Sequence, residues 1–207
     1  MDVASFTRTM SLVSQARREH PDEIYPPEGV VFAALERTPV ASVRAVLLGQ
    51  DPYPGPGQAR GLAFSFLGDP DHLPGSLQNI RKELLTDEHI QAPRSGSLEP
   101  WARHGVLLLN TILTVQRGEP GSHRSFRWQV FTDAVLRAVA RKTEPVVFLL
   151  WGRVAQAKSD LVIPPHIRIE AAHPSRRSQR GFLGQHPFSK ADHALETTGR
   201  SPIDWQL

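Results

Sequence analysis

The stretch "VRAVLLGQDPYPGPGQARGLAFS", residues 43–65, begins as an apolar run and changes character at Gln50. Residues 43–49 consist mainly of Val, Ala and Leu, a composition typical of a strand that is covered on both faces in a parallel sheet. An acid, an aromatic residue and a series of prolines and glycines follow. Since such residues set stiff turns, the stretch predicts a buried strand that ends on a rigid loop carrying Asp51 and Tyr53.

Three further apolar runs resemble the first: "HGVLLLN" (104–110), "PVVFLLWG" (145–152) and "HIRIEAAH" (166–173). The last of them alternates apolar and polar residues, so we expect it nearer an edge of the sheet. Segments with helical spacing lie between the runs. This alternation predicts an α/β fold, a three-layer α/β/α sandwich around a central four-stranded parallel sheet with right-handed crossovers.

The predicted helices cover residues 76–88, 127–142 and 154–161, after an N-terminal helix from about Ser5, a turn at Tyr25 and a helical stretch over 31–36. Ser76 is a candidate N-cap. The apolar face of the helix at 76–88 is expected to comprise Leu77, Ile80, Leu84 and Leu85. In the helix at 127–142 the corresponding residues are Val130, Phe131, Ala134, Val135 and Val139.

The composition limits the classes of protein to consider. The 207 residues carry a formal net charge of +3, and the excess of arginine favours an anionic partner such as nucleic acid. With no cysteine, disulfides, thiolate nucleophiles and Cys-type zinc sites are excluded. We find no signal-peptide core, no membrane-spanning run and no linker, so we expect one domain over 1–207, without membrane association and cytoplasmic.

Polar side chains follow each predicted strand. In open α/β sheets, ligands bind outside the carboxyl ends of the strands. Asp51, Tyr53, Asn110 and His173, far apart in the sequence, are therefore expected to converge on one rim. Three of them also have a plain structural interpretation: a turn cap for Asp51, a satisfied strand end for His173 and a loop bond for Asn110. For nearby Phe64 the plain interpretation is a core position.

The motifs that are missing narrow the chemistry. The sequence contains no G-x-S-x-G turn, no H-E-x-x-H pair and no P-loop, so a serine nucleophile, a metal and a nucleotide triphosphate are not expected. An acid and an imidazole around a cleft suit water-assisted cleavage of a bond whose transition state separates charge. The carboxylate would face the developing cation and the neutral imidazole the developing anion.

Several longer motifs resemble family 1 uracil-DNA glycosylase in order and spacing. They are "GQDPYPGPGQARGLAFS", "GVLLLNTILTV", "LLWG" with "AQAK", and "HPS" with "RGFLG" and "FSKAD", within a likeness that runs from about Tyr25 to "PIDWQL". The resemblance implies a monomeric DNA glycosylase of base excision repair that flips uracil out of DNA and hydrolyses its N-glycosidic bond. It implies no cofactor or metal, uracil-containing single- or double-stranded DNA as substrate, and a protein inhibitor of the family as a further expected partner.

The resemblance also implies roles for individual residues. Asp51 and His173 match the catalytic pair, and the substrate-binding residues are Gln50, Tyr53, Phe64 and Asn110. Serine-bearing loops that pinch the DNA backbone are matched by Ser76 and Ser175. The arginines expected on the DNA side are Arg153, Arg176 and Arg177.

The sequence departs from the family pattern at three places. Pro54 and Arg60 stand where the family usually has histidines, and Arg153 follows Gly152 in place of serine. The loop "HPSRRSQRGF" lacks the leucine that normally enters the base stack, and we hypothesise that Arg177, or less favourably Arg176, takes its place. Two alternatives stay open: a uracil- or DNA-binding module without turnover, and an enzyme acting on free nucleosides.

Overall fold

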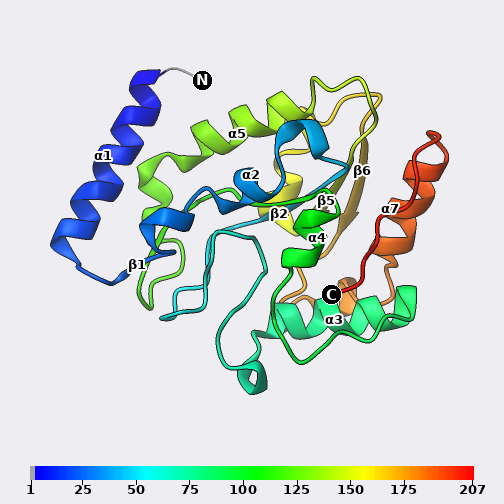
Figure 1. Cartoon of the computed structure of the whole chain (residues 1–207), viewed down its shortest axis with the longest axis horizontal. Coiled ribbons are helices and arrows are strands. Elements are labelled where there is room, and N and C mark those ends of the chain that lie inside the picture. Colours follow the sequence, from blue (N-terminus) through cyan, green and yellow to red (C-terminus); the bar gives the residue numbers. More distant parts are fainter. Residues whose placement is uncertain (1–2) are drawn as a thin grey trace.

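The computed structural model describes residues 3–207 and contains the predicted parallel sheet. Its strands are β2 (Ala45–Gly49), β3 (Val106–Asn110), β5 (Val147–Trp151) and β6 (Ile167–Ala171), in the spatial order β3-β2-β5-β6. All three strand pairs are parallel, and Gly49 lies opposite Asn110 in the register. The predicted α/β class and the four-stranded sheet flanked by helices are confirmed (Figure 1).

The burial of the strands follows the patterns of apolar and polar residues in them. Every residue of β2, β3 and β5 is buried, as expected for strands covered on both faces. In β6, Arg168 and Glu170 are exposed and alternate with more buried neighbours. The alternating run lies at an edge of the sheet, as predicted, and β3 forms the other edge although it is fully buried.

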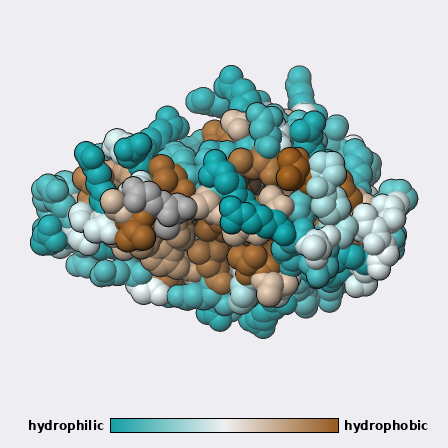
Figure 2. Space-filling model, turned by 90° about the horizontal axis from the view of Figure 1, so that it is seen from above, coloured by the Kyte–Doolittle hydropathy of each residue, from teal (hydrophilic) through white to brown (hydrophobic). Residues whose placement is uncertain are grey.

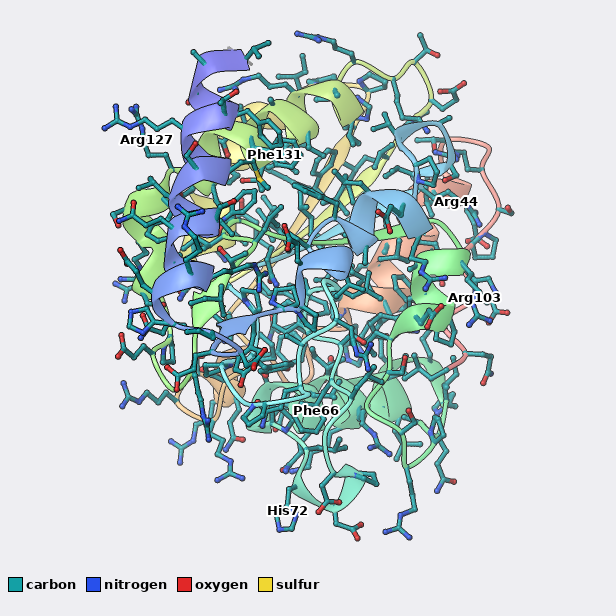
Figure 3. All side chains as sticks on the ribbon, turned by 60° about the vertical axis from the view of Figure 1, so that its left-hand side comes forward. Arg44, Phe66, His72, Arg103, Arg127 and Phe131 are labelled. Atoms are coloured by element: carbon teal, nitrogen blue, oxygen red, sulfur yellow. The ribbon has the colours of Figure 1, made fainter. Side chains whose placement is uncertain are left out.

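The helices are α1 (Val3–Glu19), α2 (Ala33–Arg37), α3 (Gly75–Glu88), α4 (Glu99–Arg103), α5 (Trp128–Val139), α6 (Arg153–Gln156) and α7 (Pro187–Glu196). In Figure 1, α5 lies above the strands and α3 below them, and α1 lies at the left-hand end. Phe131 of α5 lies beside α1 (Figure 3), with its ring centroid 5.2 Å from that of Phe6. The helix α1 thus packs against α5 at one end of the molecule.

The expected helix faces and the expected cap require correction. Leu85 is 50% exposed, whereas Leu77, Ile80 and Leu84 are buried. The helix α3 begins at Gly75 after Pro74, so Ser76 is not its N-cap. A side chain in the first turn can face another loop instead of its own helix end, and Ser76 does so. The buried positions of α5 are Trp128, Thr132, Leu136 and Val139.

Three of the other predicted residues of α5, Phe131, Ala134 and Val135, lie on a half-buried outer face together with residues of α2 and the turn after it. This surface is lined by Leu35, Pro39, Val40, Phe131, Ala134, Val135 and Ala138. Figure 2 views the molecule from the α5 side and shows hydrophobic residues gathered on it. The apolar stripe of α5 is wider than the sheet can cover. The spacing of its apolar residues therefore does not show which of them face the sheet.

A short antiparallel pair joins two distant loops. β1 (Ile24–Tyr25) pairs with β4 (Val115–Gln116), although a turn is predicted at Tyr25. The strand is too short to have a periodicity of its own, and its partner lies far along the chain. The pair holds the segment after β3 close to the N-terminal part of the chain. Within residues 3–207, none of the helices combines the length and the hydropathy that crossing a bilayer would need.

Candidate active site

The carboxyl ends of the strands surround a cavity of about 240 Å³. The structure brings seven of the predicted site residues to its lining: Gln50, Asp51, Tyr53, Phe64, Ser76, Asn110 and His173. The cavity lies below the volume usual for drug-sized ligands, which suits a single planar ring. Residues from β2, β3 and β6 and their loops meet here only because parallel strands end at the same edge of a sheet.

The loop after β2 fixes the carboxylate of Asp51. The Gln50 side-chain amide donates to Asp51 Oδ1 at 3.0 Å, and the backbone N–H of Gly121 donates to Oδ2. The carbonyl of Gln50 accepts from Ile112 N and Thr111 Oγ1, both at 2.9 Å. Both carboxylate oxygens are therefore held in place before any ligand arrives.

Tyr53 forms a wall whose position is fixed at two points. Its hydroxyl donates to the carbonyl of Phe64 at 3.3 Å and lies 3.2 Å from Ser76 Oγ. Its ring packs edge-on against Phe66 at 5.6 Å. Burial raises the pKa of the Tyr53 phenol to about 12, so the hydroxyl stays protonated. The wall cannot move without breaking these contacts.

Phe64 adopts a left-handed backbone conformation, with φ at 61°. Non-glycine residues seldom take this conformation, and it costs of order 1–3 kcal/mol at sites where surrounding structure enforces it. Its ring lies 5.8 Å from the His173 ring and 5.9 Å from that of Trp151. With this backbone the Phe64 ring both packs in the hydrophobic core and lines the cavity.

Asn110 is buried at the end of β3, with 6% of its surface exposed. A side chain at Gly49 would collide with it, because a Cβ there would lie 2.2 Å from Asn110 Oδ1. The absence of a side chain at Gly49 thus lets the amide lie directly over the neighbouring strand. Among residues 3–207, no hydrogen bond to this side-chain amide is formed, so its donor and acceptor are available to a ligand.

The imidazole of His173 is oriented by its own loop. Ser175 N–H donates to His173 Nδ1 at 3.1 Å, so in the neutral ring the proton belongs on Nε2. Burial lowers the pKa of His173 and favours this neutral form. The carbonyl of His173 accepts from Ser178 Oγ at 2.6 Å. The ring is therefore held as a donor that carries no charge.

A second hollow of about 680 Å³ adjoins the first and shares Gln50 and His173 with it. Arg153, Ser175 and Arg177, three of the residues expected on the DNA side, line this hollow. Arg176 lies elsewhere: a Cβ on Gly75 would lie 2.8 Å from Arg176 Cγ, so this side chain packs on the start of α3. The structure therefore separates the two neighbouring arginines.

Two residues that contribute to the site were not predicted from the sequence. Pro120 lines both hollows, and Gly121 supplies the backbone donor to Asp51. Gly121 adopts φ of 78°, which favours glycine. They belong to the loop after β4. The segment "EPGSH" of this loop lies far from Asp51 in the sequence. Proline and glycine in this segment predict a turn, but they do not show which residue the backbone of the turn contacts.

The fold and the site define an α/β protein in which a fixed carboxylate, an imidazole, a side-chain amide and an aromatic ring line one cavity at the carboxyl ends of the parallel strands. A family model described as "Uracil DNA glycosylase superfamily" matches residues 36–196. The chain is 54% identical to the uracil-DNA glycosylase of Geobacillus sp. (strain WCH70), over 89% of this chain and 83% of the relative. The chain belongs to the uracil-DNA glycosylase superfamily.

Two further comparisons agree. The uracil-DNA glycosylase of Deinococcus deserti is 50% identical, over 93% of this chain and 77% of the relative. A solved structure of a mimivirus UNG variant in complex with UGI superposes with a TM-score of 0.88 at 28% identity, covering 98% of this chain and 83% of that one. The chain is a DNA glycosylase that excises uracil by hydrolysing the N-glycosidic bond, as its sequence indicated.

Proposed function

We propose that Asp51 is the catalytic carboxylate of uracil excision. As the bond between uracil and deoxyribose breaks, positive charge develops on the sugar, and a fixed anion stabilises that charge only in the transition state. The same carboxylate would orient the water that adds to the anomeric carbon of the sugar. The two hydrogen bonds to the Asp51 oxygens support this role, since they remove the need for reorganisation during the reaction.

His173 stabilises the departing base. Its Nε2–H donates to uracil O2 as the bonding electrons pass to the ring, which leaves as an anion before it takes up a proton. A neutral donor suits this task, because it lowers the energy of the anion without protonating it early. The bond from Ser175 to Nδ1 and the lowered pKa of His173 support the neutral Nε2–H form.

The remaining cavity residues recognise the base. Asn110 pairs with uracil O4 and N3–H, and cytosine presents the reversed pattern, which would leave a buried amide mismatched at a cost of roughly 1–3 kcal/mol. Phe64 stacks on the flipped ring, and Tyr53 lies against C5 and excludes the methyl group of thymine. Gln50 contributes through its backbone N–H.

The DNA backbone is bound around the rim. Ser76 and Ser175 contact phosphates on the two sides of the cavity, while Arg153 and Arg177 supply cations at the second hollow. Arg176, on the start of α3, adds charge beside Ser76. Substrates are uracil-containing single- and double-stranded DNA, and a protein inhibitor of the family is a further partner. The 28% identical mimivirus structure, solved with UGI, supports that last assignment.

We further propose that the chain acts as a single-domain monomer in the cytoplasm. One chain supplies the carboxylate, the imidazole, the amide and the aromatic ring that the mechanism uses, which supports a monomer. The Geobacillus and Deinococcus relatives are bacterial, and bacterial DNA lies in the cytoplasm. Neither a cofactor nor a metal has a step in this mechanism.

The convergence of Asp51, Asn110 and His173 on one cavity carries the proposal. Matched oligonucleotides that bear uracil, thymine or cytosine at one position test it, with alkali-labile sites as the readout. We expect cleavage at uracil alone and loss of base selection in Asn110→Ala. Uracil-DNA binding without alkali-labile sites would favour the binding module, and equal activity on free deoxyuridine would favour the nucleoside enzyme.

A further inference from the structure

One peptide unit lies between His173 and the helix α3. The N–H of this unit belongs to Ser175 and donates to His173 Nδ1 at 3.1 Å. Its carbonyl belongs to Pro174 and accepts from Asn79 Nδ2 at 2.8 Å. Because a peptide unit is planar, fixing the direction of its C=O also fixes the direction of its N–H.

Asn79 is placed to hold this peptide rigidly. It lies one turn into α3 and is 2% exposed. The chain of hydrogen bonds runs from the Asn79 amide through the Pro174–Ser175 peptide to the imidazole. Linked amide hydrogen bonds in a protein interior polarise one another and strengthen each bond. Neither Asn79 nor Pro174 lines the cavity or the second hollow, so the bond between them does not compete with a ligand.

The same side of α3 holds the rest of the segment that follows His173. Glu83 is 1% exposed and accepts from Gly184 N at 2.7 Å and His186 N at 2.8 Å. One turn further, Asp87 Oδ2 accepts from the first N–H groups of α7. Asn79, Glu83 and Asp87, which we call the polar row of α3, recur every four residues and so share one side of the helix.

The polar row accounts for a cluster that resembles a cation site. Ligand-type atoms of Glu83, Asp87 and His186 lie within 4.8 Å of one another. Both Glu83 oxygens and one Asp87 oxygen already accept backbone N–H groups. The two carboxylates thus hold the backbone that leads into α7. Asn79 is the member of the polar row whose hydrogen bond lies closest to His173.

We propose that Asn79 is a positioning residue for uracil excision, which acts through the Pro174–Ser175 peptide to set the orientation and the tautomer of the His173 ring. The proposal rests on the role proposed above for His173. The backbone next to His173 has a separate anchor, because Ser178 Oγ donates to the His173 carbonyl. Loss of the Asn79 amide should therefore free the peptide plane to rotate without releasing the loop.

Two variants and a matched control test this assignment in the full chain. Asn79→Ala removes the amide, and Asn79→Leu removes it while keeping the volume of a buried side chain. Gln78→Ala is the control: Gln78 Nε2 donates to the carbonyl of Leu73 at 2.7 Å, the same kind of bond one residue earlier in the same helix. Thermal melts would show that the compared proteins are folded.

The readouts are single-turnover excision at saturating uracil DNA and the ¹⁵N shifts of the His173 ring. In both Asn79 variants we expect the excision rate to fall about tenfold, DNA affinity to change less than twofold, and the Nδ1 shift to move towards that of a mobile ring. Gln78→Ala should leave the rate and the shifts unchanged.

Unchanged ring shifts and an excision rate within twofold of the parent in Asn79→Leu would overturn the positioning role. His173→Ala distinguishes this result from a failure of the proposed function. If His173→Ala excises uracil normally, the assigned role of His173 is wrong. If His173→Ala is inactive while Asn79→Leu is normal in rate and shifts, only the role of Asn79 is wrong.

Discussion

Acidification should destabilise the protein through a histidine outside the cavity. His123 is 2% exposed and stacks on Phe126 with 3.9 Å between ring centroids. Its Nδ1 lies 2.8 Å from Thr114 Oγ1, which also accepts from Trp128 Nε1 at 2.7 Å. Burial, with smaller contributions from the positive charges of Arg17 and His20, lowers the pKa of His123 from 6.5 to about 4.

The sign of the effect follows from the order of the two pKa values. The unfolded chain takes up the proton near pH 6.5 and the folded chain near pH 4, so the free energy of unfolding falls as the pH falls through this window. At pH 5 the difference between the two pKa values lowers the free energy of unfolding by about 2 kcal/mol. Salt and nearby water screen part of the shift, so we expect about 1–2 kcal/mol.

Urea denaturation at pH 7 and pH 5 measures this difference. His123→Gln keeps a polar partner for Thr114 and does not titrate, so its free energy of unfolding should fall by about 1–2 kcal/mol less than that of the parent. Other histidines titrate alike in both proteins and cancel. An identical fall in the parent and in His123→Gln would refute the assignment of a buried neutral His123.

Three further outcomes follow from the site. Tyr53→Ala should admit the thymine methyl, so thymine excision becomes measurable while uracil excision falls; no thymine product would show that another residue excludes the methyl group. Arg177→Ala should slow excision from duplex far more than from single strands and lower the salt slope of duplex binding by about one unit, and equal losses on both substrates would remove Arg177 from the base stack. Gly121→Ala should destabilise the fold by about 1–2 kcal/mol, since φ is 78° and a Cβ there would lie 2.8 Å from Arg124 Nε. It should also slow excision, because the backbone of Gly121 holds Asp51. An unchanged melting temperature would contradict the expected loss of stability.

The sequence predicted those parts of the fold in which one residue pattern has one structural meaning. The four apolar runs became the four parallel strands: three short, nearly continuous Val and Leu runs fit strands covered on both faces, and the fourth alternates. The rim residues could be predicted because they directly follow strands. The edge position of β6 could be predicted from the alternation of Arg168 and Glu170 with apolar neighbours.

Contacts made by backbone atoms were beyond the reach of the pattern. The N–H of Gly121 and the carbonyl of Pro174 are backbone groups that nearly every residue type carries. No sequence motif therefore indicates what they bind. Ser76 was assigned to its own helix end because a cap is the usual role of serine before an apolar stretch. In the structure the Ser76 hydroxyl instead makes a tertiary hydrogen bond with Tyr53.

The most direct test of the account is the single-turnover rate of uracil excision by Asp51→Asn, measured at DNA concentrations that saturate binding. Asparagine keeps the size of the side chain and removes the negative charge. We predict a rate at least a hundredfold below that of the parent, an unchanged dissociation constant for uracil DNA, and a further loss in the double variant with His173→Ala. A rate for Asp51→Asn within a few fold of the parent would contradict the claim that this fixed anion drives the separation of the sugar and the base.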